Sequence, residues 1–469
     1  MKSFRPHIRH KYDHLITKTG LTSHSARVCD IFFREPHPRD TFAFVKTKCK
    51  AMTAITMRLD NASNIYPASL TKRYASLFRQ SVTLSEPVNV NYLQQALNNT
   101  VKRIPSFGCT LKNGAFWWYL KELNKLPIVG EYTSLSPFGY KFHGGFLFKV
   151  SVDDCRIVLD VFHALADGKG GQTFLLTLTA EYLRLRYGIK IDYNELILDP
   201  TDTPSKRESE DCFTEFSGKK GEMDQNGKAY HTHGHKVGYR TLHNERVIVP
   251  FDELKTVTSK YSCTVTDLIT AAMVSAIQEV HKHDHRKAKK TAIKVSVPVN
   301  LRPIFGGRTL RNFSSYVNLG VDVSNGYFSF EEILENVSAQ KRHLVLRSEL
   351  ERKVAANVAL ENNFAVAMIP LFIKRYAIDT VCRVKGDKII SQTFSNLGNV
   401  VLPDSMKQYV REMDFMLGRQ RGTPGAAAAV GYNGNLYLNF SRNIVEADFE
   451  SYFVDQLHQL GITTKQVSE

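Results

Sequence analysis

Residues 156–185 constrain the fold of this chain more than any other stretch. The run 156–162 (RIVLDVF) is mostly apolar and rich in branched side chains, which predicts a strand buried on both faces. From Gly170 onward, apolar residues recur at helical spacing, as Phe174, Leu178, Tyr182 and Leu185. A short turn of small and apolar residues separates the two patterns. We therefore expect an α/β fold in which the strand delivers His163 to the turn.

His163 and Asp167 are residue types suited to proton transfer. Imidazole titrates near neutral pH, so a neutral His163 could accept the proton of an alcohol or amine that attacks a carbonyl, a role usually contributing ~10²–10⁴ in rate. Asp167 could hold the ring through its other nitrogen, or bind a neighbouring arginine and fix the turn. Gly168 and Gly170 permit the tight backbone. The alternative is a hydrogen-bonded histidine at a strand end and an aspartate that caps a helix.

The order of strand, histidine, three small or apolar residues, aspartate, glycine and helix resembles the HHxxxDG signature of the condensation-type CoA-dependent acyltransferases. His163 matches the second histidine of that signature, and Asp167 and Gly168 match its aspartate and glycine. Phe162 stands in place of the first histidine. The second histidine is the base in that superfamily, so the resemblance implies this role for His163.

Two further segments carry the resemblance, which spans the chain from about residue 58 to the C-terminus. SVPVNLRP (296–303), with Arg-Asn-Phe at 311–313, is similar to a strand and loop of the second half of the family. SQTFSNLGNVVLP (391–403) is similar to the element that lines the family's active-site tunnel. The likeness is to alcohol acetyltransferases and their bacterial relatives, with wax ester synthases and polyketide-associated acyltransferases as neighbours. Residues 414–418 match the plant DFGWG signature poorly.

The resemblance implies an α/β fold of two chloramphenicol-acetyltransferase-like lobes in one chain, with the active-site tunnel at their interface. It implies an acyl-CoA, expected to be acetyl-CoA, as co-substrate, a small-molecule alcohol as acceptor, and no bound cofactor. The sequence contains neither a GxSxG motif nor a cysteine beside a base, so we expect direct transfer without a covalent acyl-enzyme.

Four residues outside the turn have roles implied by the resemblance. Ser395 and Asn396 are candidate donors to the oxyanion, and a polar turn at a strand end is an equally open interpretation. Arg302 either pairs with Asp167 across the lobes or is a cation near the coenzyme. We expect Asn312 to satisfy loop backbone rather than to contact substrate.

Two alternative functions stay open. One is a non-catalytic, acyl-CoA-binding member of the same fold, to which the replacement of the first histidine by Phe162 lends weight. The other is an amide-forming or carrier-protein-dependent condensation domain.

The chain divides into four predicted parts. Residues 1–57 carry five histidines and many charges without periodicity, which predicts a disordered extension or an upstream start codon, with Met52 or Met57 as the true beginning. Residues 58–198 form the N-terminal lobe, 199–243 a linker or crossover, and 244–469 the C-terminal lobe.

Charge and cysteine content indicate which ligands and which cellular compartment to expect. Residues 1–57 hold 11 Lys and Arg against 4 Asp and Glu, and the net charge of the whole chain is +16. The excess in the remainder suits the phosphates of coenzyme A, and without basic blocks we expect no nucleic acid. The seven cysteines are scattered, which is typical of a reducing cytosol. We expect a cytoplasmic monomer with no transmembrane segment, and read His231, His233 and His235 as a polar loop rather than a metal site.

Overall fold

The computed structural model describes residues 55–135, 144–222, 227–238, 240–284 and 290–468. These residues belong to a compact unit that runs from Ala54 to Glu469. Only the last three residues of the predicted extension are described, so the expected disorder of residues 1–54 lies outside the described residues. Within the described ranges, no single helix is long and apolar enough to cross a bilayer; the bent pair α4 (Phe251–Lys260) and α5 (Val265–Lys282) meets the length and composition criteria together.

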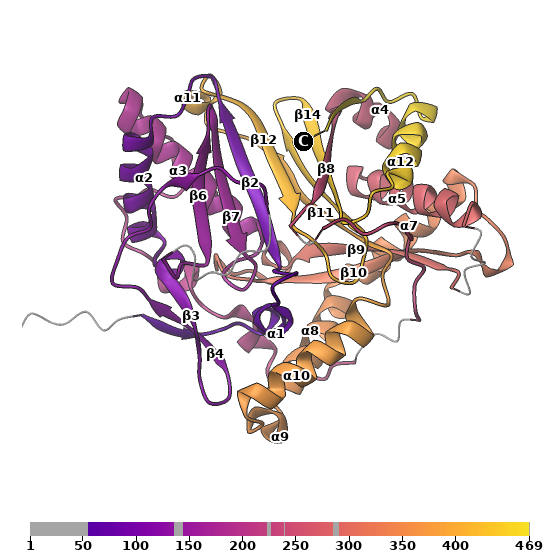
Figure 1. Ribbon diagram of the computed structural model, residues 1–469, viewed down its shortest axis with the longest axis horizontal. Coiled ribbons are helices and arrows are strands. Elements are labelled where there is room, and N and C mark those ends of the chain that lie inside the picture. The colour runs from indigo at the N-terminus through magenta and orange to yellow at the C-terminus, as the bar shows by residue number, and fades with distance from the viewer. Residues whose placement is uncertain (1–54, 136–143, 223–226, 239, 285–289, 469) are drawn as a thin grey trace, which may run out of the picture. The chain divides into compact units, whose positions relative to one another are not determined.

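The first lobe is built on a sheet with strand order β12-β2-β7-β6-β5. Four of its strands come from the first half of the chain: β2 (Leu77–Leu84), β5 (Gly130–Glu131), β6 (Phe148–Asp153) and β7 (Arg156–Phe162). Helices α2 (Val90–Arg103) and α3 (Gly168–Tyr187) lie side by side along this sheet (Figure 1). Every residue of β7 after Arg156 is buried, which confirms the predicted strand, and α3 confirms the helix that follows it.

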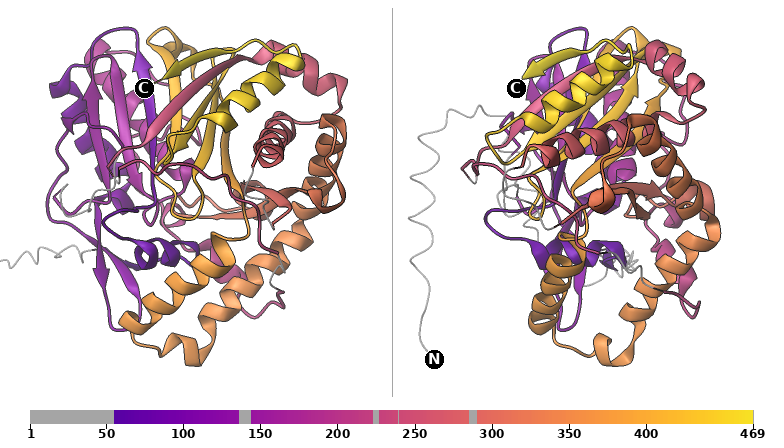
Figure 2. Two further views of the ribbon diagram at one scale, coloured as in Figure 1. Left: turned by 45° about the vertical axis from the view of Figure 1, so that its right-hand side comes forward. Right: turned by 90° about the vertical axis from the view of Figure 1, so that its right-hand side faces the viewer.

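The second lobe is built on a sheet with strand order β10-β9-β11-β13-β14-β8-β15. Its strands are β8 (His243–Pro250), β9 (Ala292–Asn300), β10 (Ser314–Asp322), β11 (Gln392–Val400), β13 (Gly425–Tyr432), β14 (Asn435–Arg442) and β15 (Lys465–Ser468). Helices α4, α5, α7 (Phe330–Leu344) and α12 (Asp448–Gln459) pack on it, as Figure 2 shows.

Strand β12 (Val410–Leu417) crosses from the second half of the chain into the first lobe. It pairs antiparallel with β2, and the Gly418 N–H donates to the Leu77 carbonyl at 2.8 Å. The predicted C-terminal lobe, 244–469, therefore departs from the structure here. Apolar alternation predicts a strand, but it does not tell which of two sheets the strand joins.

Strand β13 forms the apolar seam between the lobes. Ala426, Ala428 and Val430 belong to the core of the first lobe, whereas Ala427 and Ala429 belong to the core of the second. Successive side chains of a strand point to opposite faces, so this run of alanines serves two cores. Small side chains let both lobes approach the strand closely.

The predicted linker or crossover, 199–243, has regular local structure in its described part. It contains the turns Lys206–Glu208 and Cys212–Phe216. Phe213 and Phe216 are buried in a third cluster with Leu301 and Phe313 of the second lobe. The polar composition of the segment gave no indication that these two aromatic side chains are buried.

A small sheet of order β1-β4-β3 and several short helices complete the fold. They are β1 (Thr56–Arg58), β3 (Cys109–Asn113), β4 (Trp118–Glu122), α1 (Ile65–Ser69), α6 (Arg302–Phe305), α8 (Arg347–Asn362), α9 (Phe364–Ala367), α10 (Leu371–Val381) and α11 (Asp404–Lys407). Single turns are Ala62–Asn64, Pro105–Gly108, Val323–Asn325 and the π-helical Cys382–Gly386.

Truncation at the two candidate start residues should give different results. The Ile55 N–H donates to Glu122 Oε2 at 2.9 Å, and the Ile55 carbonyl accepts from the Glu122 N–H at 2.9 Å. A chain that starts at Met52 keeps these bonds and should match the full chain in stability. A chain that starts at Met57 loses both and should be less stable by about 1–2 kcal/mol, since each bond contributes roughly 0.5–1.5 kcal/mol. Urea unfolding measures the difference, and equal stability of both truncations would contradict it.

Candidate active site

The turn after β7 holds His163 at the C-terminal end of this central strand of the first sheet. The His163 N–H donates to the Ser76 carbonyl at 2.8 Å, and the Leu165 N–H donates to the Phe162 carbonyl at 2.8 Å. These bonds continue the strand pairing for one residue and then reverse the chain. Gln80 Nε2 donates to the Gly168 carbonyl at 2.7 Å, which ties the start of α3 to β2. The backbone around His163 is thus fixed from both sides.

Asp167 is buried and binds Arg302 of the second lobe. Arg302 Nη1 donates to Asp167 Oδ2 at 2.8 Å, and Nη2 donates to Oδ1 at 3.2 Å. The carboxylate also accepts the Gly170 N–H at 2.9 Å, as the N-cap of α3, and the Phe313 N–H at 3.0 Å. Burial alone would raise the pKa of Asp167, but the Arg302 charge and these hydrogen bonds hold that pKa below its usual value. Of the two arrangements that the sequence left open, the structure has the indirect one, and Arg302 is the arginine that binds Asp167.

His163 contacts Asn312 instead of Asp167. Asn312 Nδ2 donates to the His163 carbonyl at 2.9 Å and to Ser63 Oγ at 2.8 Å. Only the amide nitrogen can donate to a carbonyl, so the amide oxygen faces the ring, 3.1 Å from His163 Nδ1. Nδ1 therefore carries the proton, and Nε2 keeps a free lone pair. Asn312 satisfies backbone, as predicted, and in addition sets the tautomer of the ring.

Burial decides the charge of His163. The ring is half-buried, and burial lowers its pKa below the ordinary value for histidine, although the nearby Asp167 charge and the Asn312 hydrogen bond act in the opposite direction. The imidazole is therefore neutral at pH 7. A neutral ring with an unprotonated Nε2 can accept a proton.

Two aromatic rings enclose the imidazole. Tyr66, from α1, stacks on it with 4.4 Å between ring centroids and 20° between planes. Phe78, from β2, meets it edge-on at 5.3 Å. The Phe78 contact follows from the pairing of β2 with β7. Nothing in the sequence around Tyr66 indicates that α1 lies against the His163 turn. Sequence reasoning missed this residue.

Glycines let the second lobe approach the turn closely. A Cβ on Gly170 would lie 2.0 Å from the Leu310 carbonyl oxygen, and a Cβ on Gly168 would lie 2.8 Å from Leu397 Cδ2. Leu397 belongs to β11, so the SNLG segment lies beside the His163 turn. Gly170 is needed for close packing across the seam because its Cβ would meet backbone, whereas the Leu397 side chain can move away from a Cβ on Gly168.

The two predicted oxyanion donors differ in what they contact. Asn396 Oδ1 accepts the Gly398 N–H at 2.8 Å, and Asn396 Nδ2 donates to Thr266 Oγ1 at 3.3 Å. This is the arrangement of a polar turn at a strand end. Ser395 is half-buried, one residue earlier in β11. Within the described residues, neither side chain is hydrogen-bonded to His163 or its turn.

The buried carboxyl group of Asp60 is linked to Asn312 through Ser63. Asp60 Oδ2 lies 3.5 Å from Arg311 Nη2, and Asp60 Oδ1 accepts the Ser63 N–H at 2.8 Å. Ser63 in turn accepts from Asn312. Burial raises the pKa of Asp60 to about 6, against the opposing effect of Arg311. Sequence reasoning did not single out Asp60, because it lies far from the motif along the chain.

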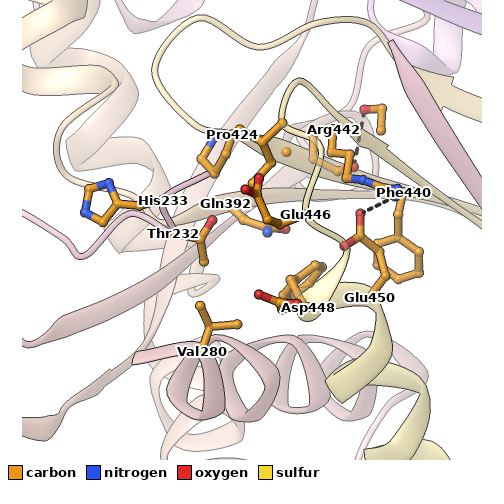
Figure 3. Close-up of a pocket in the computed structure, with 15 residues that line it drawn as sticks. Thr232, His233, Val280, Gln392, Pro424, Phe440, Arg442, Glu446, Asp448 and Glu450 are labelled. Carbon is orange, nitrogen blue, oxygen red and sulfur yellow. Dashed lines mark hydrogen bonds and ion pairs between the residues drawn. The ribbon is translucent and has the colours of Figure 1, made fainter. Parts of the chain in front are cut away.

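A separate cavity lies in the second lobe, between α5, the ends of β13 and β14, and residues 444–450 (Figure 3). Its lining includes His233, Arg442 and Glu450 but none of the predicted site residues. His235 binds Glu446 at 2.6 Å. In the part of the chain that the structure describes, no group of three or more His, Cys, Asp or Glu side chains is arranged to hold a metal ion.

Comparisons with known proteins identify the fold. No family model matches the sequence, and no curated protein is significantly similar to it. The structure is similar to polyketide synthase associated protein 5 from Mycobacterium tuberculosis (TM-score 0.56, 12% identity, 86% of this chain and 97% of that chain covered). It is also similar to TRI3 trichothecene 15-O-acetyltransferase from Fusarium sporotrichioides (TM-score 0.54, 14% identity, 87% of this chain and 94% of that chain covered). A third similar structure is F. graminearum TRI101 with coenzyme A and T-2 mycotoxin (TM-score 0.56, 10% identity, 88% of this chain and 100% of that chain covered). These similarities confirm the predicted two-lobed α/β fold class.

Proposed function

We propose that this chain, whose fold is that of the condensation-type CoA-dependent acyltransferases, transfers an acyl group from coenzyme A to an alcohol hydroxyl. The observation that carries the proposal is the hydrogen bond of His163 Nδ1 to Asn312, which leaves Nε2 as a proton acceptor at the seam between the lobes. Burial keeps this ring neutral at pH 7. A neutral imidazole held in one tautomer is what general-base catalysis requires.

The proposed reaction has two steps. Nε2 takes the proton of the acceptor hydroxyl while its oxygen bonds to the thioester carbonyl carbon, which gives a tetrahedral intermediate with a negative oxygen. This intermediate collapses as the carbon–sulfur bond breaks, and the proton on Nε2 passes to the departing thiolate. The products are an ester and free CoA thiol, and His163 is neutral again.

Ser395 is the better candidate to stabilise the negative oxygen. The amide of Asn396 already binds Thr266 and Gly398, whereas the hydroxyl of Ser395 is half-buried on the same strand. Loss of one oxyanion donor typically costs about 2.7–4 kcal/mol of barrier.

Arg302 and Asp167 are proposed as positioning residues. Their pair joins the two lobes at the turn that presents His163 and makes no hydrogen bond to the imidazole among the described residues. It therefore orders the turn and does not relay a proton. Lys169 follows the turn, and burial lowers its pKa.

The substrate classes rest on the similar structures and on the sequence. TRI3 is named as a 15-O-acetyltransferase, and TRI101 was crystallised with coenzyme A and T-2 mycotoxin. Both point to a CoA thioester, proposed to be acetyl-CoA, and a hydroxyl acceptor. The positive charge of the chain suits the phosphates of the coenzyme.

A thiol-release screen tests the proposal. The full chain is supplied with acetyl-CoA and longer acyl-CoAs, crossed with alcohols, amines and carrier-protein thioesters. Release of CoA thiol that depends on an alcohol supports the proposal. Activity only with a carrier thioester would identify a condensation domain. Tight acyl-CoA binding without turnover would identify a non-catalytic member, which the buried Phe162 in place of the first motif histidine makes worth testing.

The pH dependence should report the environment of His163. The neutral ring is the active form, so kcat/KM should rise with pH and reach half its maximum below about 6.5, the ordinary pKa of histidine. Asn312→Asp places a carboxylate beside Nδ1, which favours the charged ring and should move this limb to higher pH. Tyr66→Phe keeps the stacked ring and should leave the limb in place. An unchanged limb in Asn312→Asp would contradict the proposed contact.

A further inference from the structure

Helix α10 buries a lysine and exposes aromatic side chains, the reverse of what is usual for a helix at a protein surface. Its side chains Leu371 and Lys374 are buried, whereas Phe372 is 76% exposed and Tyr376 is 77% exposed. An amphipathic surface helix normally buries its aromatic residues and exposes its lysines. Helix α10 has the reverse of this pattern.

The exposed apolar residues continue into the elements before α10. Leu360 at the end of α8, Phe364 in α9, and Met368 are 53%, 79% and 51% exposed. Together with Phe372, Ile373 and Tyr376 they define what we call the α9–α10 surface. Figures 1 and 2 show α9 at the far end of α8 and α10, away from the two large sheets. Soluble proteins rarely gather so many large exposed apolar side chains in one short segment.

The buried lysine fixes the orientation of α10. Lys374 Nζ donates to the Phe116 carbonyl at 3.0 Å and to the Ala367 carbonyl at 3.2 Å, and it lies 3.4 Å from the centroid of the Trp117 ring. Rolling the helix to bury its aromatic residues would break all three contacts. The outward position of Phe372 and Tyr376 is therefore held by the fold.

Cations border the α9–α10 surface. Arg375 Nη2 donates to the Leu70 carbonyl at 3.0 Å, and the exposed Lys72 and Arg73 follow Leu70 closely in the chain. In the part of the chain that the structure describes, these three side chains form no ion pair with an acid. The nearby acids, in contrast, are paired, since Glu361 binds Arg58 and Asp379 binds Arg421. The border is therefore basic.

We propose that the α9–α10 surface docks on an anionic lipid bilayer, with its aromatic side chains among the acyl chains and its cations at the headgroups. An interfacial helix with an apolar face and basic borders binds membranes in this way. Charge favours a bilayer over a second copy of the chain, because two copies meeting at this surface would bring the same cations together. Helix α1 packs on α10 and carries Tyr66, so the surface lies one helix away from His163.

Vesicle sedimentation tests the proposal with the full chain. Binding should be stronger to vesicles of phosphatidylcholine mixed with phosphatidylglycerol than to phosphatidylcholine alone. The triple variant Phe364→Ser, Phe372→Ser, Tyr376→Ser should bind mixed vesicles at least about tenfold more weakly, since each large apolar side chain contributes strongly when buried. Replacing Lys72 and Arg73 with glutamate should weaken binding to mixed vesicles about tenfold and leave phosphatidylcholine binding unchanged.

A matched variant distinguishes binding by the α9–α10 surface from non-specific binding by exposed apolar side chains elsewhere. Ile128, Val401 and Val445 are 83%, 68% and 57% exposed elsewhere in the fold, and serine at all three should leave vesicle binding unchanged. All variants keep residues 1–57, so differences between them report the surface alone. The three α9–α10 side chains are exposed, so the melting temperature of the triple variant should match that of the wild type.

Three outcomes would overturn the proposal. They are no binding of the wild type to either kind of vesicle, equal binding by the triple variant, and self-association that the triple variant abolishes in the absence of vesicle binding. The last would assign the surface to a second copy. The measurement needs no turnover, so failure of the acyl-transfer proposal would leave it intact.

Discussion

Replacing His163 with alanine is expected to lower the release of free CoA thiol by about 10²–10⁴, the usual contribution of a general base. The loss follows because, among the residues that the structure describes, no second base contacts the His163 ring. Tyr66 and Phe78 enclose the ring, and burial raises the pKa of Tyr66, so its hydroxyl stays protonated and cannot act as the base. Without the imidazole, the acceptor alcohol must attack with its proton in place.

The measurement must separate chemistry from folding. His163→Ala leaves the amide oxygen of Asn312 without its ring partner, which costs about 1–3 kcal/mol of stability, so the variant should still fold. Circular dichroism and acyl-CoA affinity should therefore resemble those of the wild type. His231→Ala is the matched control, because burial also lowers the pKa of His231 while the residue lies outside the seam. It should keep full turnover.

A folded His163→Ala variant that keeps turnover within about tenfold of the wild type would remove His163 from the chemistry. The Asn312 contact would then be a structural bond at a strand end, and the non-catalytic interpretation would gain support. Partial rescue of the variant by added imidazole would, in contrast, show that the missing group is a proton acceptor and not a structural one.

The elements around the motif were predictable because their signals are local. A buried strand shows as an apolar run, and α3 shows as apolar residues at helical spacing, so β7 and α3 follow from residues close together in the chain. The resemblance added the Arg302–Asp167 pair, which no local pattern contains. The composition of residues 351–374 also fits one continuous helix, but the extended backbone of Asn363 ends α8, and Pro370 separates α9 from α10.

The remaining features depend on tertiary structure. The choice of β12 to join the first sheet, the return of α1 to the His163 ring and the Asn312 bond to Nδ1 each join segments far apart in sequence. Alternation and helical spacing describe single elements and carry no information on their partners. The tautomer of His163, on which the proposed chemistry depends, is set by Asn312, which lies 149 residues away in the chain.

Replacing Asp167 with alanine is expected to destabilise the protein by about 3–5 kcal/mol and to lower turnover. The Arg302 side chain is only 12% exposed and would lose its counter-charge, keeping only neutral oxygen acceptors. The variant also removes the N-cap acceptor of α3 and the acceptor of the Phe313 N–H. Urea unfolding gives the stability, and initial rates per folded molecule give the turnover.

The pH dependence of this stability has a definite sign. The pKa of Asp167 is depressed in the folded state, so its contribution is complete above about pH 4, the ordinary aspartate value, and is lost as the pH falls through the depressed pKa. The advantage of the wild type over Asp167→Asn should therefore shrink below about pH 4. An advantage that grows on acidification would contradict the depressed pKa.

A double-mutant cycle and a matched pair test whether the Arg302–Asp167 contact acts on the seam. Removing both partners should cost less than the sum of the single replacements, because no buried charge is left unpaired. The Arg79–Asp160 pair is buried in the first lobe, with 2.6 Å between Arg79 Nε and Asp160 Oδ1, and joins β2 to β7 without reaching the second lobe. Asp160→Ala should therefore lose similar stability and yet keep its turnover per folded molecule. If both aspartate variants lost turnover in proportion to stability alone, the Arg302–Asp167 pair would be one more buried ion pair, and the His163 turn would owe its geometry to Asn312 and the backbone.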